Sequence, residues 1–200
     1  MTLFNNKYRI ESARLKHWDY SNNGMYFITI CTNTMKNYFG KIVDGKVILN
    51  KFGKYVEHCW IDIPKHSKYV ELDEFVIMPN HIHGIIGIDN PNDSFSNNDN
   101  NVVVETRHAL SNNKNSTKET GHALSLQHPR FRNQGKNSIS AMVGSFKSAV
   151  TKYANKNNIP FKWQSRFYDH VIRDEKELNN IREYIISNPE QWKKDKYYQQ

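Results

Sequence analysis

The stretch YVELDEFVIMPNHIHGIIGI, Tyr69 to Ile88, predicts two neighbouring strands of an antiparallel sheet. Its first half alternates between apolar and polar residues and then becomes continuously apolar up to Met78, as is typical of a strand that enters a core. Pro79 and Asn80 follow directly and form a turn signal. Because this connection is so short, the second strand, His81 to Ile88, is expected to run antiparallel to the first.

Two histidines lie one residue apart in the second of these strands. Side chains alternate along a strand, so His81 and His83 share one face while Ile82 points to the other. Two neighbouring imidazoles are suitable ligands for one divalent metal ion. The spacing alone is equally compatible with two polar side chains on a solvated strand face, and both interpretations stay open here.

The rest of the chain supplies further strands and helices around this pair. The expected elements are a strand at Gly24 to Thr32, a hairpin at Lys41 to Leu49, a helix at about Lys51 to Ile61 ended by Pro64, an amphipathic helix that begins at Ser138, a strand at Phe167 to Ile172, and a helix that begins at an Asp174/Glu177 capping box and ends at Pro189. Tight antiparallel connections with helices between them predict an α+β fold, in which helices pack mainly on one face of one sheet.

Residues 90 to about 137 interrupt this pattern. They are rich in Asn, Ser, Asp, Lys and Thr, and the segment ETRHALS recurs as ETGHALS. Such a composition buries too little apolar area to offset the entropy of ordering. We interpret this segment as a polar insertion within a single domain of 200 residues, and its histidines, His108 and His122, as products of the duplication rather than ligands.

The composition favours a basic protein with an anionic partner. Lys and Arg number 28 against 20 Asp and Glu, which gives a net charge of +8, and the eleven Tyr residues offer surfaces for base stacking. A basic, solvated surface without a specific partner is the alternative. The two cysteines form no zinc or disulfide pattern, and the sequence has no apolar run of transmembrane or signal-peptide type, so a cytoplasmic protein without a membrane partner is expected.

The C-terminal helix carries a second candidate for chemistry. Tyr184 and Asn188 are four residues apart and lie on one helical face. That face borders the apolar stripe of Leu178, Ile181 and Ile185, which places it where the helix meets the sheet. An ordinary tyrosine at the boundary of the core is the alternative interpretation.

Four segments occur in the order seen in one family of transposases. FVIMPNHIHGII, SFKSAVTKYA, WQSRFYDHVIRDEKEL and IREYIISNPEQW resemble those of REP-associated tyrosine transposases, which are relatives of the single-tyrosine HUH transposases of bacterial insertion sequences. The resemblance covers about residues 20–89 and 138–192 and does not include the polar insertion.

The resemblance implies a fold and an activity. The fold would be ferredoxin-like, with the histidines on a central antiparallel strand. His81 and His83 would hold Mg²⁺ or Mn²⁺, Asn188 would complete the metal site, and Tyr184 would be the nucleophile. The enzyme would be an endonuclease that cleaves and rejoins single-stranded DNA at hairpins through a covalent 5′-phosphotyrosine, acting as a monomer or a homodimer.

Several other side chains are candidates for DNA contact. Trp163, Gln164, Arg166 and Arg173 are predicted to contact DNA, and Lys147, Lys152 and Arg182 to contact phosphates. Core packing is an equally good interpretation of Trp163, and exposure to solvent is the alternative for Lys147, Lys152 and Arg182. Tyr168 could stack on a base, whereas Tyr153 ends an amphipathic helix and is expected in the core.

Two rival functions remain compatible with the sequence. A non-catalytic module that binds single-stranded nucleic acid would use the same charge and aromatic residues. A zinc hydrolase would use His81, His83 and His170 as ligands. Covalent, metal-dependent trapping of DNA would distinguish the transposase from both.

Overall fold

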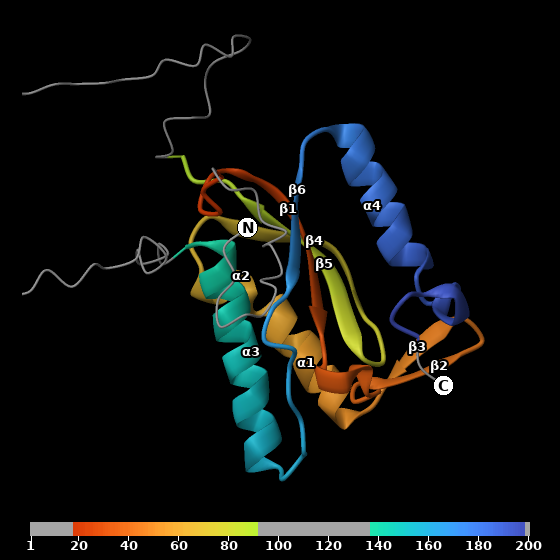
Figure 1. Cartoon of the computed structure of the whole chain (residues 1–200). Helices are drawn as coiled ribbons and strands as arrows, with labels where there is room; N and C mark the ends of the chain where they lie inside the picture. The colour runs from red at the N-terminus through yellow and green to blue at the C-terminus, as the bar shows by residue number, and fades with distance from the viewer. Residues whose placement is uncertain (1–17, 92–136, 199–200) are drawn as a thin grey trace, which may run out of the picture.

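The computed structural model describes residues 18–91 and 137–198 (Figure 1). Most of the predicted insertion at about 90–137, including His108 and His122, lies outside the described residues. Among the helices of the described ranges, none combines the length and the apolar character that a membrane crossing requires.

Four antiparallel strands form the main sheet in the order β4-β5-β1-β6. These strands are β1 (Gly24–Cys31), β4 (Val70–Ile77), β5 (His81–Ile88) and β6 (Tyr168–Ile172). Helix α1 (Lys51–Ile61) connects β1 to β4, and α3 (Ile139–Lys156) connects β5 to β6. This is the βαββαβ connectivity of a ferredoxin-like fold, so the predicted fold class and the central position of the histidine strand are confirmed.

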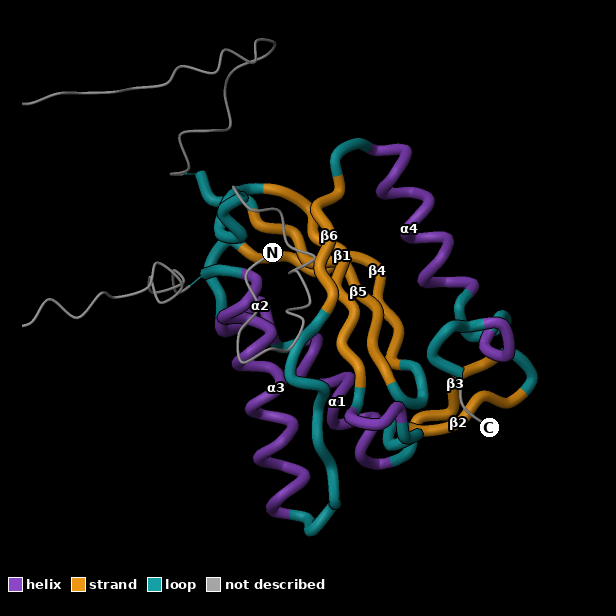
Figure 2. The backbone as a smooth tube through the Cα atoms, in the orientation of Figure 1, coloured by secondary structure: helices purple, strands orange, loops and turns teal. Residues whose placement is uncertain are grey.

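Helices cover both faces of the sheet, most of them on one (Figures 1 and 2). Ile28 and Ile82 belong to the larger core cluster, which includes residues of α1 and α3 and Ile63 of the short helix α2 (Ile63–His66). On the opposite face, Ile185 of α4 (Glu175–Ser187) packs against Ile85 and Ile172. The prediction of helices mainly on one face therefore holds for α1, α2 and α3, and α4 covers the other face.

The helix ends follow the capping signals with two differences. The side chain of Asp174 accepts a hydrogen bond from the Glu177 backbone N–H at 2.8 Å, as predicted. The reciprocal bond differs, because the Glu177 carboxylate accepts from the backbone N–H of Arg173, one residue before the cap. Pro64 does not end α1 itself. It lies in the first turn of α2, where a missing N–H has no cost, and α1 ends at its cap Asp62.

The predicted hairpin is present beside the main sheet. It consists of β2 (Gly40–Val43) and β3 (Lys46–Leu49). Its two turn residues, Asp44 and Gly45, have φ values of 50° and 72°. Positive φ at both positions is the requirement of a type I′ turn, which explains the Asp-Gly pair.

Gly84 allows α1 to approach the sheet directly behind the histidines. A Cβ atom there would lie 2.4 Å from Cζ2 of the buried Trp60 and 3.0 Å from Cβ of Phe75. We expect Gly84→Ala to lower the free energy of unfolding by about 1–3 kcal/mol. The buried ring of Trp60 and the Cβ of Phe75, which is fixed to its strand, cannot move away freely. Urea unfolding measures this loss. The matched control is Gly144→Ala in α3, where a Cβ meets no atom within 4 Å, and it should stabilise the protein by about 0.5–1 kcal/mol.

Candidate metal centre and nucleophile

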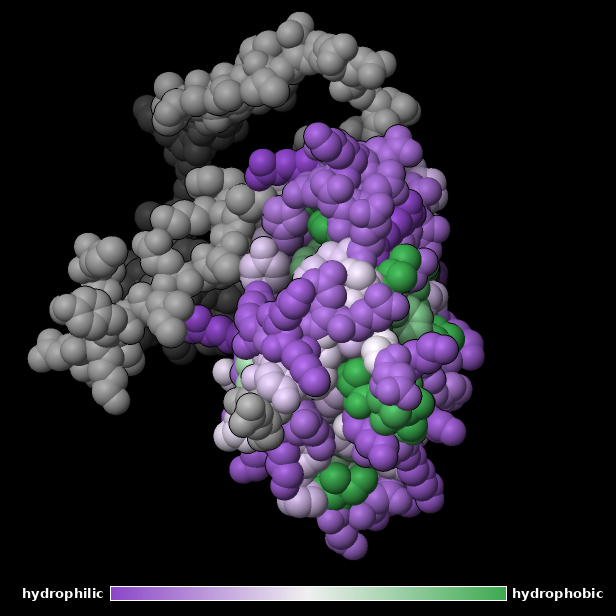
Figure 3. Space-filling model, turned by 90° about the vertical axis from the view of Figure 1, so that its right-hand side faces the viewer, coloured by the Kyte–Doolittle hydropathy of each residue, from purple (hydrophilic) through white to green (hydrophobic). Residues whose placement is uncertain are grey.

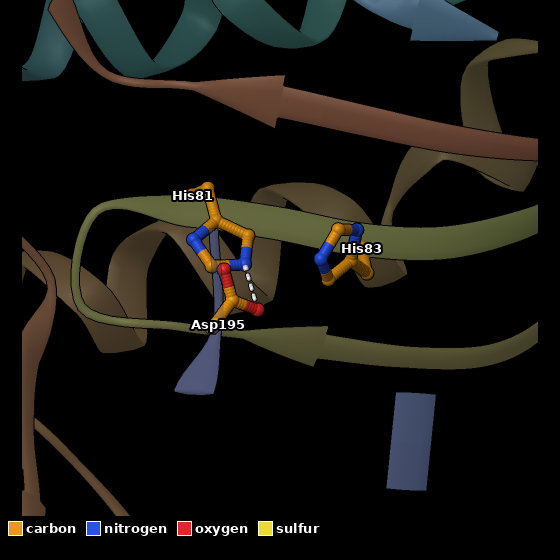
Figure 4. A group of neighbouring side chains, drawn as sticks. All are labelled: His81, His83 and Asp195. Carbon is orange, nitrogen blue, oxygen red and sulfur yellow. Dashed lines mark ion pairs between the residues drawn. The ribbon is translucent and has the colours of Figure 1, made fainter. Parts of the chain in front are cut away.

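His81 and His83 lie on the face of β5 that α4 covers. Both side chains are buried, and their ring centroids are 4.5 Å apart. Ile82 points to the opposite face and joins the larger core cluster, as the alternation predicts. Figure 4 shows the two rings side by side along the strand, so they are positioned to share one ligand.

The tautomer of His81 follows from its neighbour Asn80. The amide nitrogen of Asn80 donates to the carbonyls of Met35 and Tyr197, both at 2.8 Å, which turns its oxygen toward the ring. Nδ1 of His81 lies 2.8 Å from that oxygen and must donate, because an amide oxygen only accepts. Nε2 therefore presents a lone pair, and among the described residues it has no hydrogen-bond partner. Burial lowers the pKa of His81 to about 3, so the ring is a neutral ligand at physiological pH.

His83 is held between two hydroxyl groups. Its Nδ1 lies 2.9 Å from Oγ1 of Thr29, its direct partner on β1, and its Nε2 lies 3.1 Å from Oη of Tyr184. Burial, together with the nearby His81, lowers the pKa of His83 well below its usual value. Each hydroxyl can donate or accept, so both tautomers of the neutral ring fit these contacts, and the one that donates from Nδ1 to Thr29 presents a lone pair at Nε2.

Asp195 completes a group that the sequence did not reveal. The carboxylate comes from the C-terminal segment after the short helix η3 (Trp192–Lys194), and its Oδ2 lies 4.0 Å from Nε2 of His81 (Figure 4). One ligand atom from each of His81, His83 and Asp195 lies within 4.8 Å of the others. The buried ring of Trp192, 5.9 Å from that of His81, anchors the segment.

Asn188 touches this group through Asp195. Its Nδ2 donates to Oδ2 of Asp195 at 2.9 Å, while the backbone N–H of Tyr197 donates to Oδ1 at 2.6 Å. Asn188 is buried, and its own Oδ1 has no hydrogen-bond partner within the described part of the chain. The role of Asn188 as a metal ligand stays a prediction. The structure adds a second role, because Asn188 orients the carboxylate of Asp195.

The donor set fits a divalent cation. The Asp195 side chain is only 3% exposed, although a buried carboxylate is costly unless it is paired or binds a metal. Beside it lie two neutral imidazoles and the unpartnered amide oxygen of Asn188. Carboxylate, amide oxygen and imidazole are ligands that Mn²⁺ accepts, and Mg²⁺ prefers the oxygen atoms among them.

Tyr184 presents its hydroxyl to the same group. The side chain is 41% exposed, and its ring lies edge-on to that of Phe27, with centroids 6.2 Å apart. Burial raises the pKa of Tyr184 to about 12, the charge of Asp195 adds to this effect, and a hydrogen bond with Asn188 opposes it. The phenol is therefore protonated at neutral pH and must lose its proton during any nucleophilic attack.

An open pocket of about 520 Å³ gives access to this hydroxyl. It is lined by Phe27, Thr29, His83, Tyr168, Tyr184, Ser187, Asn188, Gln191, Lys194, Asp195 and Lys196. Residues of β1, β5, β6, α4 and the C-terminal segment thus meet in one place.

The chain is similar over nearly its whole length to a protein that carries no assigned function. No model of a known protein family matches it. An uncharacterised protein of Haemophilus influenzae is 38% identical over 189 residues, which cover 94% of this chain and 92% of that protein. The chain belongs to the same family as this protein.

Two solved structures resemble the chain in fold. One is a REP-associated tyrosine transposase bound to a REP hairpin, at 17% identity and a TM-score of 0.49, covering 92% of this chain and 74% of that one. The other is a candidate transposase of Deinococcus radiodurans, at 15% identity and a TM-score of 0.36, covering 86% and 96%. The transposases predicted from the sequence motifs are thus among the structural neighbours. Because both TM-scores lie below 0.5, we take the function from the geometry of the site.

Two of the predicted phosphate contacts have partners inside the protein. Arg182 binds both carboxylate oxygens of Asp73, at 2.8 and 2.5 Å, and so joins α4 to β4. Lys147 donates to the carbonyls of Gln164 and Arg166, at 2.8 and 3.1 Å. Burial lowers the pKa of Lys147 to about 8. Both side chains therefore hold the fold together, whatever they contribute to DNA binding.

The remaining predicted DNA contacts divide into packed and exposed residues. Trp163 is half-buried in an aromatic cluster with Phe39 and Phe161, and its indole N–H donates to the carbonyl of Lys147. This is the packing role that the sequence left open. Gln164 is half-buried, and its backbone N–H donates to the carbonyl of Cys31. The exposed residues are Lys152, Arg166 and Arg173, whose contact with DNA stays a prediction.

Proposed function

We propose that the protein is a transposase-type endonuclease that cleaves and rejoins single-stranded DNA through a covalent bond between Tyr184 and a 5′ phosphate. The observation that carries this proposal is the 3.1 Å contact between Oη of Tyr184 and Nε2 of His83, one of the three potential metal ligands. A nucleophile beside a cation site is an arrangement that suits metal-assisted phosphoryl transfer.

The residues that would hold Mg²⁺ or Mn²⁺ are His81, His83 and Asp195, with the amide oxygen of Asn188 beside them. Such an ion, when bound, polarises the scissile phosphate and offsets the charge that develops there. Asn80 and Thr29 fix the two ring orientations through the opposite nitrogens. Asn188 and the Tyr197 backbone orient the carboxylate, so each donor has a second contact that positions it.

The covalent step follows from the place of Tyr184. Its oxygen attacks the phosphorus, the bond from phosphorus to the 3′ oxygen breaks, and the strand downstream of the cut stays attached to tyrosine through its 5′ phosphate. The phenol loses its proton, and the leaving 3′ oxygen gains one. The new link is again a phosphodiester, so a 3′ hydroxyl can displace the tyrosine and rejoin strands without ATP.

This activity would belong to one domain. We extend the proposal to a single catalytic domain interrupted by residues 90–137, acting on hairpin DNA in the cytoplasm. The protein would act as a monomer or a homodimer, and analytical ultracentrifugation would distinguish the two.

The experiment that tests the function is covalent trapping. The protein is incubated with single-stranded hairpin oligonucleotides of varied flanking sequence, with Mg²⁺, Mn²⁺ or EDTA, and analysed by denaturing electrophoresis. A label at the 3′ end should appear in a protein adduct, a label at the 5′ end should be released, and EDTA should prevent both. A module that only binds nucleic acid would give no adduct, and a hydrolase would cut without one.

Replacing Asp195 should weaken metal binding. We expect Asp195→Ala to lower the affinity for Mn²⁺ by at least about tenfold, because it removes the only carboxylate of the donor group. Isothermal titration calorimetry measures this without DNA. The control is Glu183→Ala, an exposed carboxylate on α4, which should leave the affinity unchanged. Equal Mn²⁺ affinity for Asp195→Ala and the control would remove Asp195 from the proposed ligand set.

A further inference from the structure

We propose that the pocket beside Tyr184 holds one unpaired nucleobase of the DNA strand, stacked on the ring of Tyr168, with Lys194 and Lys196 facing the adjoining backbone. This inference rests on the proposed function, because it assigns the nucleotide next to the scissile phosphate to the same pocket. It adds a substrate-binding subsite on β6, a strand that contributes neither the nucleophile nor a metal ligand.

His83, Thr29 and Tyr168 form one row of directly paired residues across the strands β5, β1 and β6. Thr29 of β1 pairs with His83 of β5 on one side and with Tyr168 of β6 on the other. Directly paired residues on neighbouring strands point to the same face, so Tyr168 shares the face of His83. Two strand spacings separate them, roughly 10 Å in all. A base attached to a nucleotide whose phosphate lies at Tyr184 can reach across this distance.

The ring of Phe27 contacts the rings at both ends of the row, those of His83 and Tyr168. The ring of Phe27 stacks on that of His83, with centroids 5.4 Å apart and an interplanar angle of 23°. The same ring meets Tyr184 and Tyr168 edge-on, at 6.2 and 6.3 Å. The pocket therefore offers ring faces and edges from the nucleophile to the sheet edge, which is the kind of surface on which bases stack without regard to sequence.

The end of the row at Tyr168 is open. β6 is an edge strand, and the Tyr168 side chain is 44% exposed although it shares a face with buried residues. Helix α4 leans toward the other edge of the sheet, where Arg182 binds Asp73 of β4. The rings of Phe27, Tyr168 and Tyr184 thus line the pocket at the β6 edge and leave space for a ligand.

Two lysines give this pocket the charge that a nucleotide needs. Nζ of Lys196 lies 6.0 Å from the centroid of the Tyr168 ring, and Lys194 also lines the pocket. Asp195, between them in sequence, turns its carboxylate to His81 instead. The C-terminal segment thereby presents the Asp195 carboxylate to the metal site and two exposed lysines to the pocket. Their positive charge suits a phosphate backbone that runs past Tyr184 toward Tyr168.

The pocket is large enough to hold a nucleobase. Its volume of about 520 Å³ lies within the range for small ligands, about 300–1,000 Å³. The surface on the side of α4 is largely hydrophilic, with separate hydrophobic clusters (Figure 3). The aromatic rings and the two lysines that line the pocket match an unpaired base and its backbone, so we assign the pocket to single-stranded DNA.

The test uses the Tyr184→Phe protein, so that binding is measured without cleavage. A single-stranded oligonucleotide that contains 5-iododeoxyuridine is bound and irradiated, and the crosslinked peptide is identified by mass spectrometry. We expect the crosslink on Tyr168. In parallel, fluorescence anisotropy with an unmodified strand should show Tyr168→Ala weakening binding roughly 5- to 100-fold, the range for loss of one stacked base. Tyr168→Phe and Tyr168→Trp should bind like the parent.

The control is Tyr69→Ala, which removes a tyrosine of similar exposure, 43%, in the turn directly before β4. Crosslinks elsewhere, together with equal affinity for Tyr168→Ala and this control, would overturn the subsite. So would an effect of Tyr168→Ala that Tyr168→Phe shares, because the phenyl ring keeps the stacking surface. The trapping experiment is independent, since base stacking can persist in a protein that forms no adduct and an adduct can form without it.

Discussion

Tyr184→Phe should abolish the covalent protein–DNA adduct, with a loss of at least about a thousandfold in cleavage rate. The substitution removes one oxygen, the atom that lies 3.1 Å from Nε2 of His83 and that would attack the phosphorus. The ring and its edge-on contact with Phe27 remain, so folding and DNA affinity should barely change. Denaturing electrophoresis with a 3′-labelled strand measures the adduct, and thermal unfolding confirms the fold.

The metal affinity of the same variant separates two explanations for lost cleavage. In the structure the Tyr184 hydroxyl and a cation would use the same lone pair of His83. Removing a competing hydrogen bond worth about 1 kcal/mol should leave Mn²⁺ binding unchanged or up to about fivefold tighter. A protein that lost both the adduct and Mn²⁺ binding would indicate a damaged site rather than a missing nucleophile.

The position of the adduct provides the second check. Other tyrosines lie near the pocket or carry exposed rings, and mass spectrometry of the trapped wild-type protein distinguishes them. Tyr197 has its ring 4.6 Å from that of His81, and Tyr168 lies on β6. Tyr153 stacks on Tyr55 and Phe52 at the helical face, away from the histidines. An adduct on any of these residues would show that Tyr184 is not the nucleophile.

The local signals in the sequence were sufficient for the sheet and the histidine pair. The antiparallel return at Pro79-Asn80 and the alternation around Ile82 are decided within a few residues, and the structure has Ile77 opposite Ile82 and both histidines on one face. The helical period of residues 178–185 likewise placed Ile185 in contact with the sheet and Tyr184 at its margin. Side-chain direction in a strand or helix follows from spacing alone.

The third potential ligand, the carboxylate of Asp195, could not be found in this way. Asp195 lies in a polar tail between two lysines, where composition predicts solvent exposure. It reaches His81 because the chain turns after α4, Trp192 is buried, and Asn80 binds the Tyr197 carbonyl 117 residues away in sequence. The local signals were a few aromatic residues in a charged tail, Trp192, Tyr197 and Tyr198, and such isolated residues do not reveal where they pack.

The partners of two basic residues, Arg182 and Lys147, also could not be predicted from the sequence. The charge of Arg182 and Lys147 predicts phosphate contacts, but their partners are a carboxylate 109 residues away and two carbonyls beyond the end of α3. Such partners appear only once the topology brings β4 beside α4 and the segment before β6 beside α3. Charge in a sequence indicates attraction to anions in general, and the fold decides which acceptor, a carboxylate or a carbonyl, lies nearest.

The histidine pair gives the second large effect. We expect His81→Ala and His83→Ala each to lower the rate of adduct formation by at least about a thousandfold, because each removes one of three donors that hold the cation. His83→Ala additionally removes the hydrogen-bond partner of the Tyr184 hydroxyl. DNA affinity should change little, since most of it comes from phosphate contacts that do not involve buried imidazoles. Trapping assays and anisotropy on the same preparations measure the two quantities.

The control for this pair is His66→Ala, which removes an exposed imidazole at the end of α2. It should form the adduct at the wild-type rate, whereas the buried variants should fail with both Mg²⁺ and Mn²⁺ although they remain folded. Mn²⁺ titration links the loss to its cause, because His81→Ala and His83→Ala should each bind the ion at least about tenfold more weakly. A buried-site variant that forms the adduct normally would mean that Tyr184 is activated without a metal held by β5, and the buried carboxylate of Asp195 would then need another explanation.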